Sequence, residues 1–509
     1  MLAKIQSGAL RGLECEAVDV EVDILFALPF FSIVGLPDTA IQEARERVHS
    51  AIKNSDFPYP RTRIVVNLAP AHLRKMGPLY DLPMALGILV TSGILDPDLL
   101  ENTLVVGELA LDGRVRPVNG IIALTEFARE RGFKKIVIPA ENSEEARVID
   151  GIQIIPLRHL RDIISTLKNP PALPAKAADT IERIDRVDMS DIKGQMQAKR
   201  ALEIAAAGGH NVLLNGAPGA GKTMMAKVMR TILPAMMTEE MLEVTKVYSV
   251  AGRLNKERGL VTERPFRIIH HTASAVSIVG GGNPPRPGEI SLAHRGVLFL
   301  DELAEFPKQV LEVLRQPMED RTITISRAQG SLVYPAQFTL IAAMNPCPCG
   351  YHNVPHPTQK CQCHAFQIQR YHKKISGPLL DRIDMHLFIN PVDPKYFGAS
   401  APTESSAVIR ERVEKVRSIQ RIRFKNEKFS INSEMQNREI QRYCPLTTEA
   451  QQLLNRAMET FEYSARSYYR IIKIARTIAD LDAQEKIEVR HLAEALQYRQ
   501  KIFNCNILA

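Results

Sequence analysis

The fold of this chain is decided by the stretch His210-Asn-Val-Leu-Leu-Asn-Gly-Ala-Pro-Gly-Ala-Gly-Lys-Thr223. Its apolar run Val212-Leu-Leu214 predicts a buried strand, and residues 224–233 have the periodicity of a helix. The turn between them matches G-x-x-x-x-G-K-[ST] at every fixed position: Gly216, Gly221, Lys222 and Thr223. A strand before this motif and a helix after it identify a phosphate-binding loop.

The chemistry of this loop predicts a site for ATP and Mg²⁺. Glycine lets backbone N–H groups approach a phosphate that Cβ atoms would block. Lys222 supplies a positive charge for the β- and γ-phosphates, and Thr223 supplies a hydroxyl for Mg²⁺. The residues expected to enclose the phosphates are Gly216, Ala217, Pro218, Gly219, Ala220 and Gly221.

Two later strands end in polar residues that suit the same site. Residues 296–300 are apolar and lead into Asp301 and Glu302. Asp301 is expected to bind the Mg²⁺ hydration shell, and Glu302 to orient or deprotonate the attacking water. Residues 338–344 form a further apolar strand that ends at Asn345, whose amide could polarise that water. The alternative for Asn345 is a turn residue before a proline.

The order of phosphate loop, Asp-Glu strand and Asn strand resembles the AAA+ ATPases. Gly377-Pro-Leu-Leu-Asp-Arg382-Ile-Asp384 resembles the segment that carries their arginine finger, so the resemblance implies that Arg382 completes the site of a neighbouring subunit. The alternative is an ion pair with Asp381 or Asp384. Ser464-Ala-Arg466 resembles the sensor-2 motif, which implies that Arg466 reaches the γ-phosphate.

Composition limits the class of protein. The chain has 509 residues, too many for one core, and its 45% hydrophobic and 24% charged residues are ordinary for a globular protein. The longest apolar stretch, residues 82–95, is too short to span a bilayer, and no signal peptide is visible, so we expect a cytoplasmic protein with no membrane partner. A net charge of +8 favours a polyanionic partner.

The N-terminal region, residues 1–167, has the pattern of an α/β domain. Strands are expected at residues 17–24, 63–68 and 135–138, and a helix at 38–52. The stretches 76–84 and 107–120 resemble the Lon protease domain, which has the ribosomal S5 domain 2-like fold. Leu79 and Ile122 occupy the places of the Lon nucleophile and lysine, and neither can perform covalent catalysis. We therefore expect a Lon-like domain without peptidase activity.

The rest of the chain divides into a linker, an ATPase core and a lid. Residues 168–187 have the Pro/Ala composition of a linker, residues 188–395 are expected to form the α/β ATPase core, and residues 396–509 a helical linker and lid. Within the lid region, residues 410–428 carry eight Lys or Arg and three Glu. This basic run is either a solvated helix face or a nucleic-acid contact.

Two insertions stand out in the core: the first predicts a loop or hairpin, and the second a hairpin. Residues 272–291 begin as a helix and break at three glycines and three prolines, and residues 322–334 alternate around Arg327-Ala-Gln-Gly330. Together they resemble the helix-2 insert and pre-sensor hairpin of magnesium chelatase ATPases and MCM helicases. The resemblance implies that Arg286 and Arg327 touch a strand threaded through a ring. The alternative is that both are solvated loop arginines.

Four cysteines, Cys347, Cys349, Cys361 and Cys363, lie within seventeen residues. In a reducing compartment they favour a structural Zn²⁺ site, with His352, His356 or His364 as possible replacements for one thiolate. Reactive or idle thiols are the alternative. A catalytic zinc is not expected, because four thiolates leave no open position.

Taken together, these motifs resemble the YifB/ComM family over nearly the whole chain. The resemblance implies a hexameric ATP-driven DNA helicase that promotes branch migration of single-stranded or branched DNA during natural transformation. The basic composition is compatible with this function but does not specify DNA. Two alternatives are a motor subunit of a metal chelatase, which the fused Lon-like domain and the cysteine cluster disfavour, and an ATP-dependent protease, which Leu79 and Ile122 disfavour.

Overall fold

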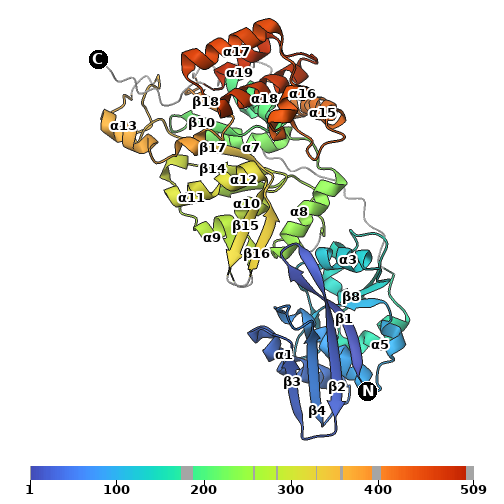
Figure 1. Cartoon of the computed structure of the whole chain (residues 1–509). Helices are drawn as coiled ribbons and strands as arrows, with labels where there is room; N and C mark the ends of the chain where they lie inside the picture. The colour runs from blue at the N-terminus through green and yellow to red at the C-terminus, as the bar shows by residue number, and fades with distance from the viewer. Residues whose placement is uncertain are drawn as a thin grey trace.

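The computed structural model describes residues 2–172, 187–255, 258–282, 285–327, 330–355, 359–392 and 403–499, with the backbone alone at 327 and 330. The chain forms an N-terminal α/β unit, blue in Figure 1, and a larger unit above it that carries the phosphate-binding loop. Residues 173–186, the centre of the expected linker 168–187, lie outside the described residues.

The N-terminal unit is built on a mixed seven-stranded sheet in the order β3-β4-β2-β1-β5-β8-β9. Alternation is clear in the interior strand β2: Val18, Val20 and Val22 are fully buried, whereas the acidic residues between them are half-buried. The predicted strands at 17–24, 63–68 and 135–138 are confirmed. The strands are β1 (Ala3–Arg11), β2 (Glu14–Leu25), β3 (Phe30–Val34), β4 (Arg63–Ala69), β5 (Thr103–Val105), β8 (Lys135–Pro139) and β9 (Gln153–Leu157), with a small hairpin of β6 (Glu108–Leu109) and β7 (Val115–Arg116).

Helices cover this sheet. The predicted helix at 38–52 is α1, whose first turn is capped by the Asp38 carboxylate accepting from the Ile41 N–H at 2.9 Å. The long apolar stretch forms α2, which is buried in the core, and among the described residues no helix is both long and apolar enough to cross a bilayer. The helices are α1 (Thr39–Asn54), α2 (Asp81–Thr91), α3 (Ile121–Glu130), α4 (Ser143–Ala146) and α5 (Ile163–Lys168).

The second unit contains a five-stranded, entirely parallel sheet in the order β11-β14-β17-β10-β18. The phosphate-loop strand β10 lies between β17 and β18. Because the strands are parallel, the residues that follow β10, β14 and β17 meet at one edge. The strands are β10 (Val212–Gly216), β11 (Phe266–Ile269), β14 (Val297–Leu300), β17 (Thr339–Met344) and β18 (Met385–Ile389).

The helices around this sheet include α6, which begins later than predicted. A helix was expected from Asp191, but residues 189–191 form a 3-10 turn and Gln195 has a left-handed φ of 52°, so α6 starts at Met196. The helices are α6 (Met196–Gly208), α7 (Lys222–Ile232), α8 (Thr238–Val250), α9 (Ala275–Val279), α10 (Glu289–Leu292), α11 (Lys308–Val313), α12 (Arg315–Asp320), α13 (Ala365–His372) and α14 (Gly377–Leu380).

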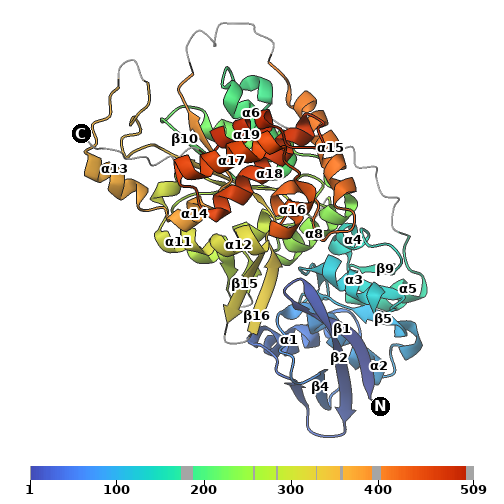
Figure 2. The ribbon, with the colours of Figure 1, turned by 45° about the horizontal axis from the view of Figure 1, so that its top comes forward.

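Two antiparallel hairpins leave this unit. β12 (Gly280–Gly281) pairs with β13 (Arg286–Pro287) between α9 and α10, and β15 (Thr322–Arg327) pairs with β16 (Gly330–Pro335) directly before β17. A loop or hairpin was predicted at the first place and a hairpin at the second, and both places form hairpins. Figures 1 and 2 show the β15–β16 hairpin projecting from the ATPase unit toward the N-terminal unit.

The C-terminal region is helical, as predicted, and Figure 1 shows its helices grouped above the parallel sheet. The helical pattern of residues 447–481 forms two helices, because Glu462 adopts a left-handed φ of 48° and ends the first. The basic helix α15 packs against α6 and α7. The helices are α15 (Ser406–Arg423), α16 (Asn437–Tyr443), α17 (Thr448–Phe461), α18 (Ala465–Leu481) and α19 (Val489–Gln497).

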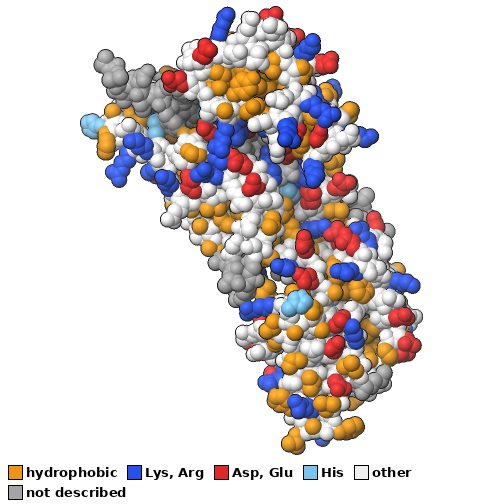
Figure 3. Space-filling model, viewed as in Figure 1, with side chains coloured by type: hydrophobic (Ala, Val, Ile, Leu, Met, Phe, Trp, Pro, Cys, Tyr) orange, Lys and Arg blue, Asp and Glu red, His pale blue; other side chains and the backbone are white. Residues whose placement is uncertain are grey.

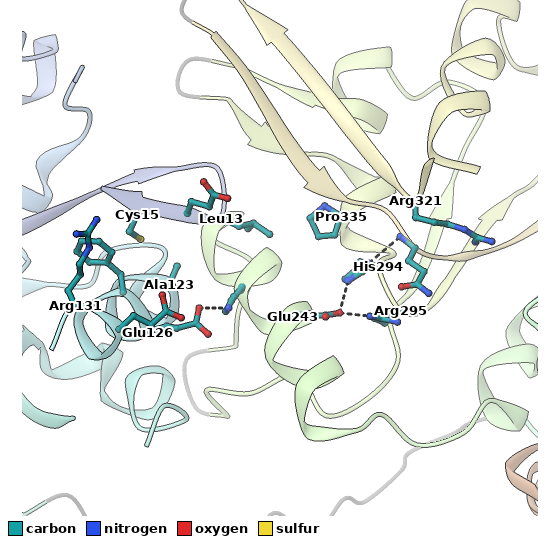
Figure 4. A pocket seen from close by; sticks show the side chains of 15 residues that line it. Leu13, Cys15, Ala123, Glu126, Arg131, Glu243, His294, Arg295, Arg321 and Pro335 are labelled. Carbon is teal, nitrogen blue, oxygen red and sulfur yellow. Dashed lines mark hydrogen bonds and ion pairs between the residues drawn. The ribbon is translucent and has the colours of Figure 1, made fainter. Parts of the chain in front are cut away.

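The two units are joined through α3 and α8. Lys246 of α8 forms an ion pair with Glu126 of α3, and the Ser249 hydroxyl donates to the buried Glu145 carboxylate. A cavity of about 710 Å³ lies beside this joint (Figure 4). In it Glu243 lies between His294 and Arg295, at 3.1 and 2.8 Å; although burial raises the pKa of Glu243, these two partners lower it to about 2.

Candidate ATP-hydrolysis site

The phosphate-binding loop has an open, preformed shape. Gly219 and Gly221 have φ values of 76° and 85°, in the left-handed region that glycine adopts without strain, and a Cβ on either would meet no atom within 4 Å. The open space on this side of the loop is where a phosphate would lie, at the N-terminus of α7. The loop residues therefore fit a bound nucleotide.

Gly216 is needed for a different reason from the one expected. A Cβ at this position would lie 2.3 Å from the carbonyl oxygen of Ile389 in β18. Gly216 allows β10 and β18 to pair closely, and it does not provide space for a phosphate.

Lys222 is held in the loop by carbonyl oxygens. Its Nζ donates to the oxygens of Gly216 at 2.7 Å and Ala217 at 2.9 Å, and to Oδ1 of Asn345 at 3.0 Å. Burial lowers the pKa of Lys222, an effect that Asp301 and Glu302 oppose. A bound phosphate would favour the charged lysine in the same way.

The structure brings three of the predicted polar residues, Asn345, Thr223 and Asp301, close to Lys222. Asn345 follows β17 and contacts Lys222 directly, as above. The Thr223 hydroxyl donates to Oδ2 of Asp301 at 3.2 Å. A hydroxyl and a carboxylate at this separation are suitable oxygen ligands or second-sphere partners for Mg²⁺.

Glu302 lies beside Asp301 in a strained conformation. Its φ of 55° is left-handed, which costs a residue other than glycine about 1–2 kcal/mol. About half of its side chain is exposed, and Oε2 lies 3.0 Å from Nδ1 of His271. The carboxylate is therefore available to a water molecule and lies beside an imidazole.

His271 is a site residue that the sequence interpretation missed. It follows β11, the edge strand next to β14, and its ring packs on that of His270 with centroids 4.1 Å apart. The sequence does contain a signal for it, because His270 and His271 directly follow the apolar residues of β11. The parallel order brings that strand end to the same edge as Glu302.

Within its own chain, Arg382 is held by α12. Its side chain is only 6% exposed, its guanidinium lies 2.7 Å from Glu319 of α12, and one of its nitrogens donates to the Pro378 carbonyl oxygen at 2.8 Å. The alternative, an ion pair with Asp381 or Asp384, is wrong, because Arg499 engages Asp381 and Arg470 engages Asp384. To reach a neighbouring subunit, Arg382 must leave Glu319.

Arg466 converges on the same carboxylate. It lies in the first turn of α18, its side chain is 55% exposed, and its guanidinium is 3.9 Å from Glu319. The two predicted arginines are therefore gathered at one acidic residue of α12. Their contact with a nucleotide stays a prediction.

The four cysteines are brought together with the geometry of a metal site. The Sγ of Cys347 lies 3.3 Å from that of Cys349 and 3.7 Å from that of Cys361, and the Cys349 and Cys361 sulfurs are 3.6 Å apart. All four sulfurs lie within 4.8 Å of one another. A tetrahedron with Zn–S bonds of about 2.3 Å has edges of about 3.8 Å, so this group fits Zn²⁺.

The local electrostatics also favour a thiolate in this group. Burial raises the pKa of Cys349, but backbone N–H groups of Tyr351 and Gln362 and the Cys347 thiol lower it to about 6. Among the histidines offered as replacements, His352 contributes a backbone N–H to the Cys347 sulfur and His364 caps α13, whereas His356 lies outside the described residues. The described part of the chain thus supplies four sulfur ligands without a histidine.

The cysteine loop lies directly against the phosphate-binding loop. A Cβ on Gly350 would be 2.5 Å from Cδ of Pro218, and the loop begins two residues after Asn345. His372 of α13 contacts the Pro346 carbonyl oxygen at 2.8 Å. The conformation of the cysteine loop therefore supports both Asn345 and the loop that binds phosphate.

We expect Cys361→Ser to reduce bound zinc from about one ion per chain to less than about a tenth, because removing a thiolate weakens a closed tetrahedral site strongly. ATP turnover should fall at least about tenfold, since the loop that contacts Pro218 loses its fold. Zinc is measured by mass spectrometry of metals and turnover by phosphate release. Cys15→Ser, outside the cluster, is the control. Equal metal content in both variants would rule out zinc at these cysteines.

The remaining predicted residues are not part of the group around Lys222. Leu79 and Ile122, at the Lon catalytic positions, are buried apolar side chains of the N-terminal unit. Arg286 is exposed at the start of β13, and the side chain of Arg327 lies outside the described residues. Cys347 is the member of the cysteine cluster that is fully buried.

Comparison with known proteins relates the whole chain to one family. Residues 188–396 match the family described as "Magnesium chelatase, subunit ChlI", residues 20–142 match "Subunit ChlI of Mg-chelatase", and residues 403–499 match "Magnesium chelatase, subunit ChlI C-terminal".

Several relatives match this chain over almost its full length. The chain is 42% identical to the competence protein ComM of Haemophilus influenzae, over 98% of both chains. It is 41% identical to the protein YifB of Escherichia coli, over 98% of this chain and 97% of that one. A local similarity to Lon protease 2 of Bacillus subtilis, 35% identical, covers 19% of this chain and 17% of that protein.

Proposed function

The chain belongs to the YifB/ComM family of magnesium chelatase-like proteins, and on this premise we propose that it is an ATP-driven motor that moves DNA. The observation that carries the proposal is the joined group Lys222, Asn345, Thr223 and Asp301, with Glu302 beside it. This group can bind the phosphates and Mg²⁺ of ATP and activate water. The named relative adds competence as the cellular setting.

The proposed motor is a ring of identical subunits, a hexamer by resemblance. The two arginines predicted to act on the nucleotide, Arg382 and Arg466, are both held at Glu319. The charge that develops on the γ-phosphate during hydrolysis is commonly met by an arginine. An arginine supplied across a subunit interface would couple hydrolysis in one subunit to the position of the next. Such coupling is the basis of directed movement along a strand.

The proposed substrate is single-stranded or branched DNA in the ring channel. The net charge of +8 favours a polyanion, but Figure 3 shows acidic and basic side chains interspersed over one face of the molecule. On that face, the positive net charge of the chain is therefore not gathered into a uniformly basic surface. The hairpins β12–β13 and β15–β16 are the elements that we assign to the channel.

We expect DNA to stimulate ATP turnover and the protein to separate a three- or four-stranded junction with ATP. The DNA binding constant should fall with salt, with a slope of log K against log salt of about −0.7 for each contacted phosphate of a single strand. Fluorescence anisotropy measures binding, and gel separation of labelled strands measures unwinding. Purified protein that forms rings but binds no DNA at low salt would contradict the proposal.

A second candidate is a chelatase-type motor that remodels a partner protein or drives metal insertion. It is favoured by the three family matches to magnesium chelatase subunit ChlI. In that case turnover should respond to a protein partner and not to DNA. The junction experiment separates these two candidates.

A further inference from the structure

A second cavity, of about 330 Å³, lies where the N-terminal unit meets both hairpins of the ATPase unit. Its N-terminal wall is the loop Met76–Tyr80 and the end of β1, and its other wall contains Arg286 of β13 and Leu332 of β16. The two walls touch: a Cβ on Gly12 would lie 3.8 Å from Leu332. The structure therefore places the loop that resembles the Lon nucleophile loop against the proposed channel elements.

The floor of this cavity is apolar. The lining includes the buried Leu79, which stands where a peptidase would carry its nucleophile, and the partly buried Leu10, Met76 and Leu332. Such a floor can cover the face of a planar ring but cannot attack a carbonyl. The volume is at the lower end for small-ligand pockets, of the size suited to one small planar group.

The rim of the cavity is cationic. Arg74 and Arg286 are both exposed there, and within the described part of the chain neither has a carboxylate within 4.0 Å. The carboxylate that lines the cavity, Glu108, already faces Arg116 at 3.5 Å. The exposed Asn119 adds an amide that can both donate and accept. An apolar floor with a cationic rim is complementary to a base and its phosphates.

We propose that this cavity receives one unstacked base of the moving DNA strand, with the neighbouring phosphates bound by Arg74 and Arg286. The inference rests on the proposed function and assigns the N-terminal unit a role in it. An extended peptide is disfavoured because the two rim arginines attract phosphates, whereas a peptide backbone is neutral. In this arrangement the unit holds the strand that the hairpins move.

Because the chain contains no tryptophan, a single introduced tryptophan reports on the cavity alone. We expect the fluorescence of Leu332→Trp protein to be quenched by an oligo-dT strand of about 20 nucleotides, since a base stacks on the indole. Combining Arg74→Glu and Arg286→Glu with this reporter should raise the half-saturating DNA concentration by about tenfold or more. Arg74→Lys, which keeps the positive charge, should by itself retain most of the DNA binding of the Leu332→Trp protein.

Matched controls address folding and position. Arg61→Glu changes another exposed arginine, which precedes β4 whereas Arg74 follows it, and should leave quenching unchanged. Phe461→Trp, on the lid, should not respond to the strand. Circular dichroism and thermal melting establish that each variant is folded.

The outcomes separate this inference from the proposed function. If DNA binds by anisotropy and stimulates turnover while the indole of the Leu332→Trp protein does not respond, the cavity assignment is wrong and the motor stands. If reduced casein quenches that indole and DNA does not, the occupant is a polypeptide and the assignment is also wrong. If no DNA binds by any measurement, both proposals fall.

Discussion

Glu302→Gln protein should bind ATP with little change in affinity and hydrolyse it about 10²- to 10⁴-fold more slowly, the usual contribution of a general base. The reason is geometric. Lys222 and Thr223 hold the positions expected to contact phosphate and Mg²⁺, whereas Glu302 is half exposed beside them and faces His271. An amide in place of the carboxylate keeps the shape but cannot accept the proton of water. Phosphate release measures turnover, and a fluorescent ATP analogue measures affinity.

The matched control is Glu305→Gln. Glu305 is three residues away and forms an exposed ion pair with Lys374 at 2.9 Å, which contributes at most about 1 kcal/mol. Its replacement should leave turnover within about twofold. If both glutamine variants hydrolyse ATP at the wild-type rate, Glu302 is not the residue that activates water.

The core of this site was predictable because its signals are local. The strand, loop and helix around Lys222 are adjacent in sequence, and their periodicity predicts each element. Asp301 and Asn345 could be added because each follows an apolar strand, and parallel strands end at a common edge. No pairing between distant side chains had to be known in advance.

The outer parts of the site depend on long-range packing and were predicted less well. Glu319 has no motif of its own, yet α12 places it between Arg382 and Arg466, which are 84 residues apart in the chain. Gly216 was assigned to phosphate binding because the motif contains it, but the neighbouring strand β18 is what requires it. The contact between the hairpins and the N-terminal unit likewise depends on how two folded units dock.

Substitutions at Arg382 and Glu319 distinguish an active site shared between subunits from one contained in a single subunit. If Arg382 acts at a neighbouring subunit, Arg382→Ala should lower turnover by about 10³- to 10⁵-fold, the usual effect of an arginine finger. Glu319→Gln removes the ion pair but keeps the guanidinium, so it should retain far more activity. A purely structural pair predicts instead that both variants lose stability and activity to a similar degree.

Mixing two inactive proteins tests the sharing directly. Lys222→Ala subunits cannot use their own phosphate loop but still carry Arg382, whereas Arg382→Ala subunits have an intact loop. In mixed rings, an Arg382→Ala site beside a Lys222→Ala subunit should regain turnover, and the recovered fraction should follow the mixing ratio. Recovery requires Arg382 to leave Glu319 when nucleotide binds next to it, a movement that brings a buried cation to the subunit interface. Mixed rings that assemble without any recovered turnover would show that each subunit hydrolyses ATP alone.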